Sequence, residues 1–124
     1  MSNIKVLLVD DEEEFVTTLA ERLEIRGYEP HTSQDGEEAL EMIDNNAYDV
    51  IVLDLMMPGL SGLEVMQQAK DNNPDLPVIL LTGHGSTREG MEGMRHGAYD
   101  YLMKPLDIDE LITKMDDAVG EKRV

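Results

Sequence analysis

Residues 4–11 read IKVLLVDD, an apolar run that ends abruptly in the carboxylates of Asp10 and Asp11. Residues 50–54, VIVLD, repeat the pattern and end in a third carboxylate. If both runs are neighbouring strands of a parallel sheet, these acids meet at one edge, where two carboxylates about 4 Å apart repel by roughly 4 kcal/mol at an effective dielectric constant near 20. A cation must offset that repulsion. The candidates are a divalent metal ion with oxygen ligands and Lys104, which follows a later strand-like run.

Near-continuous runs of Val, Ile and Leu predict the interior strands of that sheet. They span residues 4–9, 50–53 and 78–81, and such runs are typical of parallel strands that helices cover on both faces. Two weaker runs, residues 28–32 and 99–103, contain a proline or several polar residues. Because a proline within a sheet is confined largely to its edges, we expect the weaker runs to form the two edge strands.

Amphipathic segments separate the predicted strands. The first helix should begin after Asp11, where Glu12, Glu13 and Glu14 favour the positive end of the helix dipole, and should stop at Gly27. A second helix is expected from about Gly36 to Asn46, and a third should stop before Pro74. The residues predicted to face the core from the first, second and last helices are Phe15, Leu19, Leu23, Ala39, Leu40, Ile43, Ile108, Leu111, Ile112, Met115 and Val119.

Three helix starts carry the spacing of a capping box, in which a Ser or Asp precedes a Glu by three residues. The pairs are Ser61 with Glu64, Ser86 with Glu89, and Asp107 with Glu110. The helix that begins near Ser86 should reach about His96 and contains two glycines, Gly90 and Gly93. Since each glycine costs about 1 kcal/mol of helix propensity relative to Ala, we infer that this helix is marginal and easily shifted.

Strand and helix therefore alternate along the whole chain, which predicts an α/β fold. Right-handed crossovers between parallel strands give an open, doubly wound, five-stranded sheet of order 2-1-3-4-5, the flavodoxin-like (βα)5 arrangement, within one domain of residues 1–124. Ligands of such sheets bind beyond the carboxyl ends of the strands. A flavodoxin would need a Ser, Thr and Gly loop there to hold a phosphate, and the acids at 10–13 would repel one.

Composition narrows the function further. The 124 residues carry a formal net charge of −17, which argues against direct nucleic-acid binding because that binding depends on Lys and Arg. The chain has no cysteine, so disulfides, thiolate metal ligands and thiol catalysis are excluded. No apolar stretch is long enough to cross a bilayer and no leader is recognisable, so we expect a soluble, cytoplasmic protein without a membrane partner.

A set of short motifs resembles those of the receiver domains of two-component response regulators. In chain order they are Asp10-Asp11, the segment LDLMMPGLSG at residues 53–62, Thr82, Tyr101 and Lys104-Pro105. The resemblance covers essentially the whole chain. In addition, residues 84–86 (HGS) and 97–102 (GAYDYL) are similar to receivers attached to transcriptional activators of the nitrogen-regulator type.

The resemblance implies a phosphorylation site and a metal site. Asp54 would be the nucleophile that accepts a phosphoryl group from a phosphohistidine on a sensor histidine kinase or phosphotransfer protein. Asp11, Asp54 and the backbone carbonyl of Met56 would hold Mg²⁺ together with water, and Asp10 would act mainly through a bound water. Hard oxygen ligands and retained waters are what Mg²⁺ prefers.

The same resemblance assigns roles to residues on the last two strands. Lys104 and the hydroxyl of Thr82 would bind phosphoryl oxygens, and the Lys104–Pro105 peptide would be cis, which proline makes inexpensive. On phosphorylation Thr82 would move inward and Tyr101 would rotate into the vacated space. The surface of the fourth helix, fifth strand and fifth helix would then change for an output protein or effector domain.

Two residues are expected to tune access of water to the acyl phosphate. Met56 and His84 lie two residues past Asp54 and Thr82, at positions that line the mouth of the pocket in the family. We hypothesise that the apolar Met56 hinders water, whereas His84 could either shield the phosphate or orient water. Met91 and Met94, beside the glycines of the fourth helix, are candidates for exposure to a partner.

Two other functions compete with this interpretation. A haloacid-dehalogenase-type phosphohydrolase would need a second Asp two residues past its nucleophile, where this chain has Met56. A pseudo-receiver that serves only as a binding scaffold usually lacks one of the acids or the lysine, and all are present here. The receiver function is preferred, as a domain that catalyses only its own phosphorylation and dephosphorylation. The cognate kinase, the downstream target and a phosphorylation-dependent homodimer stay open.

Overall fold

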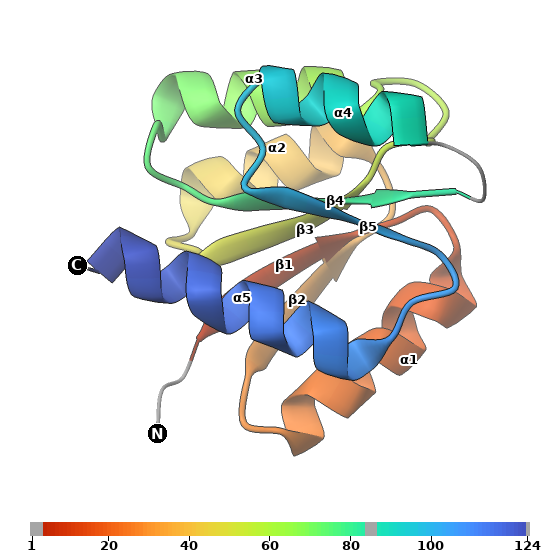
Figure 1. Ribbon diagram of the computed structural model, residues 1–124, viewed down its shortest axis with the longest axis vertical. Coiled ribbons are helices and arrows are strands. Elements are labelled where there is room, and N and C mark those ends of the chain that lie inside the picture. Colours follow the sequence, from red (N-terminus) through yellow and green to blue (C-terminus); the bar gives the residue numbers. More distant parts are fainter. Residues whose placement is uncertain (1–3, 84–86, 124) are drawn as a thin grey trace.

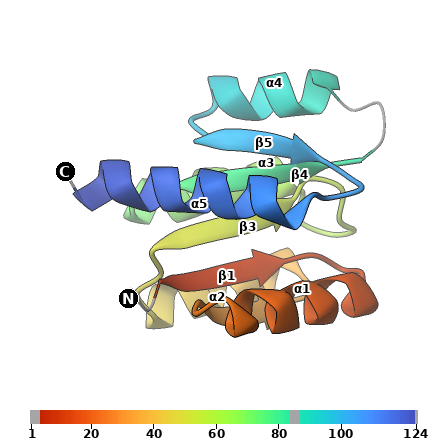
Figure 2. The ribbon, with the colours of Figure 1, turned by 60° about the horizontal axis from the view of Figure 1, so that its bottom comes forward.

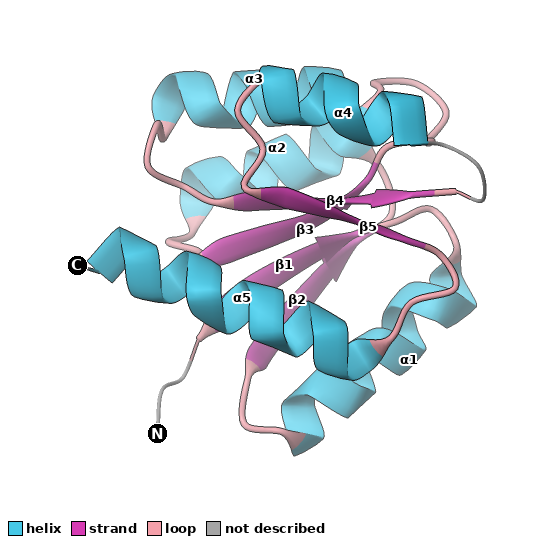
Figure 3. Ribbon diagram, in the orientation of Figure 1, coloured by secondary structure: helices cyan, strands magenta, loops and turns pink. Residues whose placement is uncertain are grey.

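The computed structural model describes residues 4–83 and 87–123, which form a parallel sheet covered by helices on both faces (Figures 1 and 3). The strand order is β2-β1-β3-β4-β5, as the sequence predicts. The strands are β1 (Lys5–Val9), β2 (Glu29–Ser33), β3 (Val50–Asp54), β4 (Val78–Thr82) and β5 (Asp100–Met103). The two weak runs are therefore the edge strands, β2 and β5.

The helices divide between the two faces of the sheet (Figures 1 and 2). Helices α1 (Glu13–Ile25) and α5 (Ile108–Arg123) cover one face. Helices α2 (Gly36–Asn45), α3 (Gly62–Asn72) and α4 (Thr87–Arg95) cover the other. None of the helices in the described part of the chain is long and apolar enough to cross a membrane.

Successive side chains of the interior strands point alternately into two hydrophobic cores, one on each face of the sheet. In β3, Val50 and Val52 point to the α1 and α5 face, whereas Ile51 and Leu53 point to the opposite face. All four are at most 1% exposed, which explains why the interior strands read as continuous apolar runs.

Most of the predicted core residues are buried, and four of them are only partly buried at the margin of a core: Phe15, Leu40, Ile108 and Ile112. In α1 the buried residues are Val16, Leu19 and Leu23. Val16 faces the sheet, whereas the Phe15 ring lies beside Lys104 at the carboxyl edge of the strands.

The helix starts follow the predicted capping chemistry where they are described. At α3, Ser61 Oγ accepts from the Glu64 N–H and Glu64 returns a bond to the Ser61 N–H, which completes the capping box. At α5, Asp107 Oδ1 accepts from the N–H groups of Asp109 and Glu110. Ser86 lies outside the described residues, so the third predicted box is not tested.

The glycines of α4 have a packing role that the sequence did not indicate. A Cβ built at Gly90 would lie 2.5 Å from Tyr101 Cδ2, and one at Gly93 would overlap Leu80 Cδ1. Helix α4 therefore lies closer to β4 and β5 than a helix with side chains at these positions could. Met91 and Met94, each directly after one of these glycines, are 53% and 41% exposed. Both were candidates for exposure to a partner.

Candidate phosphoacceptor and metal site

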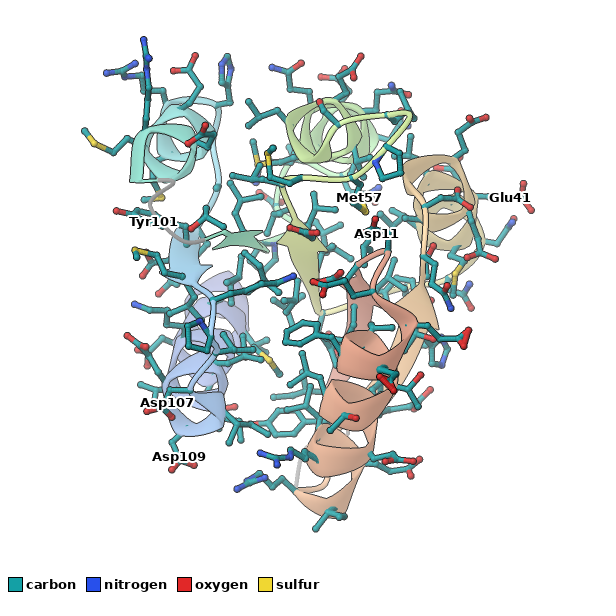
Figure 4. The ribbon with its side chains drawn as sticks, turned by 90° about the vertical axis from the view of Figure 1, so that its right-hand side faces the viewer. Asp11, Glu41, Met57, Tyr101, Asp107 and Asp109 are labelled. Carbon is teal, nitrogen blue, oxygen red and sulfur yellow. The ribbon has the colours of Figure 1, made fainter. Side chains whose placement is uncertain are left out.

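Strand register brings three carboxylates together at the carboxyl edge of the sheet. Val9 of β1 pairs with Leu53 of β3, so the next residues, Asp10 and Asp54, end neighbouring strands side by side. Oxygen atoms of Asp10, Asp11 and Asp54 all lie within 4.8 Å of one another. Figure 4 views the molecule from this edge, with Asp11 near the middle and Tyr101 toward α4.

Asp54 and Asp10 are the buried members of this group, 4% and 1% exposed. Asp54 Oδ1 accepts the N–H of Met56 at 3.2 Å. Burial and the neighbouring charge of Asp10 raise the pKa of Asp54 to about 6, although Lys104 and the Met56 hydrogen bond oppose the change. Without a further cation, the ionised form of Asp54 is therefore destabilised in the folded chain.

Lys104 supplies the positive charge at the same edge. Its Nζ lies 2.7 Å from Asp10 Oδ2, 2.8 Å from Glu12 Oε1 and 3.8 Å from Asp54 Oδ2. Burial alone would lower the pKa of Lys104, but the hydrogen bonds to Asp10 and Glu12 outweigh it and raise the pKa. Nζ also lies 4.5 Å from the centre of the Phe15 ring, a distance suited to a cation–π contact.

The backbone around Lys104 has the geometry that the sequence predicts. The Lys104–Pro105 peptide is cis. The Lys104 N–H donates to the carbonyl of Thr82, the last residue of β4, at 2.9 Å, which continues the pairing of the two strands one residue past the end of β5. The side chain then crosses the ends of β4 and β3 to reach β1.

Thr82 and Tyr101 lie on the strands next to the acidic group. Thr82 is fully buried, and its hydroxyl donates to the Leu102 carbonyl of β5 at 3.4 Å, so it is directed toward the edge strand. Tyr101 is partly buried, with its ring against α4 at Gly90. The two predicted switch residues therefore occupy adjacent strands between the acidic group and α4.

The loop between β3 and α3 fixes the backbone of Asp54 through glycine. A Cβ at Gly62 would lie 2.6 Å from the Asp54 carbonyl oxygen and 2.6 Å from Leu55 Cα, so α3 begins directly on the end of β3. Gly59 has φ +79, a conformation that residues with a side chain rarely adopt. The segment LDLMMPGLSG thus holds the central carboxylate in place.

Of the two predicted pocket-tuning residues, Met56 lies within the described residues and His84 does not. Met56 stands beside Asp54 with 63% of its surface exposed, in agreement with a place at the mouth of the site. His84 lies outside the described residues, so its predicted role is not tested.

Two residues at the site were not identified as functional from the sequence. Glu12 was interpreted only as a helix-dipole residue and Phe15 only as a core residue, yet both contact Lys104. The position of Glu12 directly after Asp10 and Asp11 could have indicated that it belongs to the site. Its contact with Lys104 could not be predicted, because the partner of a long, flexible lysine depends on tertiary geometry.

The comparisons with known proteins agree with this geometry. The family model of the response regulator receiver domain matches residues 6–116. The chain belongs to the response-regulator receiver family. Receivers are the phosphorylatable signalling domains of two-component systems, and the acidic group of this receiver is of the kind at which they bind Mg²⁺.

Similar proteins include two response regulators named MprA. The MprA of Mycobacterium sp. strain KMS is 43% identical over 112 residues, which cover 90% of this receiver and 49% of that protein. The MprA of Mycobacterium tuberculosis strain H37Ra is 41% identical over 113 residues, which cover 91% and 49%. The receiver therefore spans about half the length of the curated relatives it matches.

Solved structures also resemble this receiver. The receiver domain of the Francisella response regulator 1452 has 39% sequence identity and a TM-score of 0.89, and the match covers 96% of this receiver and 98% of that chain. NtrX from Brucella abortus has 33% identity and a TM-score of 0.90, with 96% of this receiver and 27% of that chain covered. Attachment to an activator of the nitrogen-regulator type stays a prediction.

Proposed function

We propose that Asp54 accepts a phosphoryl group from a sensor histidine kinase or phosphotransfer protein in a Mg²⁺-dependent reaction. The observation that carries the proposal is a buried carboxylate, Asp54, that lies within 4.8 Å of two others and close to an ammonium group. Asp54 Oδ2 lies 3.8 Å from Lys104 Nζ, and its other oxygen is oriented by the Met56 N–H. A carboxylate so placed is held for attack on an electrophile that enters from the open edge.

In the proposed reaction a carboxylate oxygen of Asp54 attacks the phosphorus of a phosphohistidine. The phosphorus–nitrogen bond breaks, and the imidazole keeps the electron pair of that bond and takes up a proton. Charge on the phosphoryl oxygens is then neutralised by Lys104 as a point charge and by the Thr82 hydroxyl. Since that hydroxyl donates to Leu102 in the unmodified chain, it must exchange this partner for the phosphoryl group.

The residues present fit a Mg²⁺ site by the chemistry of their donors. Asp11, Asp54 and the Met56 carbonyl would hold the ion, and Asp10 would contribute through water. Three carboxylates within 4.8 Å form a hard, anionic oxygen set of the kind this ion favours. When bound, the ion supplies positive charge that offsets both the carboxylates and the incoming phosphoryl group.

The output would follow from Thr82 and Tyr101. Movement of Thr82 toward the phosphoryl group leaves space beside Tyr101, whose ring supports α4 at Gly90. The α4, β5 and α5 surface would change as the ring moves, and an output protein or effector domain would bind it. We further propose that residues 1–124 are one cytoplasmic receiver domain.

Intact-mass measurement after incubation with acetyl phosphate tests the proposal. The wild-type chain should gain the mass of one phosphoryl group when Mg²⁺ is present and not when it is chelated. Asp54→Ala should stay unmodified, whereas Asp44→Ala, which removes an acid on the outer side of α2, should behave as wild type. An unmodified wild-type chain would indicate a scaffold, and many phosphate molecules released per chain would indicate a hydrolase.

Met56 is proposed to slow the loss of the phosphoryl group. Its thioether side chain stands beside Asp54 and cannot orient water through a strong hydrogen bond. Met56→Asn should shorten the half-life of the phosphorylated chain, measured by intact mass after removal of acetyl phosphate. Met91→Asn, on the exposed side of α4, is the matched control. Equal half-lives for wild type and Met56→Asn would refute this role.

A further inference from the structure

Glu12 occupies the N-cap position of α1 without acting as a cap. Among the residues that the structure describes, its side chain makes no capping hydrogen bond, and Glu is not one of the residues favoured at this position. Its carboxylate extends instead to the Lys104 Nζ at 2.8 Å. The side chain therefore joins the start of α1 to the segment that follows β5.

The ammonium group of Lys104 is displaced toward α1 and away from Asp54. Two of its three N–H donors bind Asp10 and Glu12 at 2.7 and 2.8 Å, whereas Asp54 Oδ2 is 3.8 Å away. The Phe15 ring holds it from the same side. Asp10, Glu12 and Phe15 all lie on α1 or just before it.

Glu12 differs from Asp10 in its relation to the acidic group. Asp10 shares that group with Asp11 and Asp54, so a divalent ion would draw on its charge. Glu12 is not part of the group, and its side chain is 64% exposed. It therefore keeps its full attraction for Lys104 when the other acids are neutralised.

Resting on the proposed roles of Asp54 and Lys104, we propose that Glu12 is a positioning residue that holds the Lys104 ammonium on the α1 side of the site until a phosphoryl group on Asp54 competes for it. Lys104 must loosen its contact with Glu12 to bind a phosphoryl oxygen. Glu12 thus favours the unmodified chain over the phosphorylated one. Because exposed ion pairs contribute little, the effect on the rate should be modest, about two- to fivefold.

The rate constant for phosphorylation by acetyl phosphate at saturating Mg²⁺ tests this role. Glu12→Gln keeps the length of the side chain and removes its charge, and it should raise the rate constant about two- to fivefold. Glu13→Gln removes the same charge one residue further on, at an exposed side chain with no ion pair in the described part of the chain. It should leave the rate close to wild type.

If Glu12 acts by positioning Lys104, the effect of Glu12→Gln on the rate constant should require that lysine, whereas a general effect of charge should not. In a Lys104→Met background, where phosphorylation is slower, adding Glu12→Gln should change the rate constant no further. Equal acceleration by Glu12→Gln and Glu13→Gln would overturn the proposal. So would a slower reaction in Glu12→Gln, or an acceleration that persists without the lysine.

An NMR measurement on the unmodified chain tests the contact independently of any reaction. The Lys104 ε-methylene adjoins the ammonium above the Phe15 ring, so the ring current shifts its proton signal, which Lys104→Arg assigns. Glu12→Gln should move that signal and Glu13→Gln should not. An unmoved signal in Glu12→Gln would contradict the proposal. Failure of the wild-type chain to react with acetyl phosphate would instead contradict the proposed function.

Discussion

Helix α5 lies on the sheet through four almost fully buried side chains, whereas α4, on the opposite face, approaches it where side chains are missing. These buried residues of α5 are Leu111, Met115, Ala118 and Val119. In α4, Gly90 and Gly93 admit Tyr101 and Leu80. One helix is thus held by buried apolar area and the other by a close steric fit to two particular side chains.

Polar contacts strengthen this contrast. Tyr28 Oη donates to Asp116 Oδ1 at 2.6 Å, and Arg26 lies 3.8 Å from Asp109, so the turn after α1 is joined to α5. Tyr101, against which α4 rests, lies in the edge strand that also accepts the Thr82 hydroxyl. A small movement of this strand can therefore shift α4 without uncovering the large apolar area on which α1 and α5 depend.

The largest expected effect is loss of a buried side chain of α5. Leu111→Ala should lower the free energy of unfolding by about 2–5 kcal/mol, because it removes apolar contacts and leaves a cavity. Urea unfolding measures the change. Met91→Ala, on the exposed side of α4, should change stability by less than about 0.5 kcal/mol. Similar losses in the two variants would remove the distinction between the faces.

The next effect comes from Asp54, at the carboxyl edge of the sheet. Burial and Asp10 raise the pKa of Asp54 from 3.8 to about 6, so between these values the folded chain keeps a proton that the unfolded chain has lost. In the absence of Mg²⁺, this group therefore reduces stability as pH rises from about 4 to 6, by a total of about 3 kcal/mol at pH 7. Asp54→Asn should recover that free energy at pH 7 and not at pH 3.

Amide hydrogen exchange in Asp54→Asn sharpens the contrast between the helices. Exchange of buried α5 amides requires global unfolding and should slow by up to about 100-fold, in line with the gain in stability. If α4 opens locally, its amides should exchange at nearly the wild-type rate. Strong slowing in both helices would show that α4 is not marginal.

A smaller effect is expected from one substitution made in both helices. Gly93→Ala should lose about 1 kcal/mol net, because overpacking against the buried Leu80 exceeds the gain in helix propensity. Gly120→Ala in α5 should gain up to about 1 kcal/mol, since no described atom lies within 4 Å of the added Cβ. Thermal unfolding of the pair tests the sign, and two changes of equal sign would contradict the packing role of Gly93.

The smallest effect should come from the polar link to α5. Tyr28→Phe removes the hydrogen bond to Asp116 and should lower the free energy of unfolding by about 0.5–1 kcal/mol. In an Asp116→Ala background the same change should cost less. A double-mutant cycle from urea unfolding gives the interaction energy, and a value of zero would mean that this link adds nothing to the α1 and α5 face.

The fold was predictable because its signals are local. The interior strands are continuous apolar runs, and proline and polar residues mark the edge strand β2. Right-handed crossovers then leave little choice of strand order. The meeting of Asp10 with Asp54 follows from the positions of the strand ends, and it is observed. The cis peptide before Pro105 is also observed, but it was expected from the resemblance to receiver domains, because proline only makes a cis bond inexpensive.

What the sequence missed depends on side-chain reach and on close packing. The choice of Glu12 as a partner of Lys104 requires the distance between two loops. Gly90 and Gly93 were predicted only to weaken α4, because propensity says nothing of the side chains beneath a helix. The bond from Thr82 to Leu102 was equally invisible, since a hydroxyl can rotate to any nearby acceptor.

The close contact at the start of α3 restricts which residues the chain can carry at position 62. Any atom added to Gly62 meets main-chain atoms of Asp54 and Leu55, which cannot move aside as a flexible side chain can. A saturation library at this position would therefore return glycine alone among variants with an undisturbed Asp54. At Gly59, where only the φ angle is demanding, asparagine would also survive.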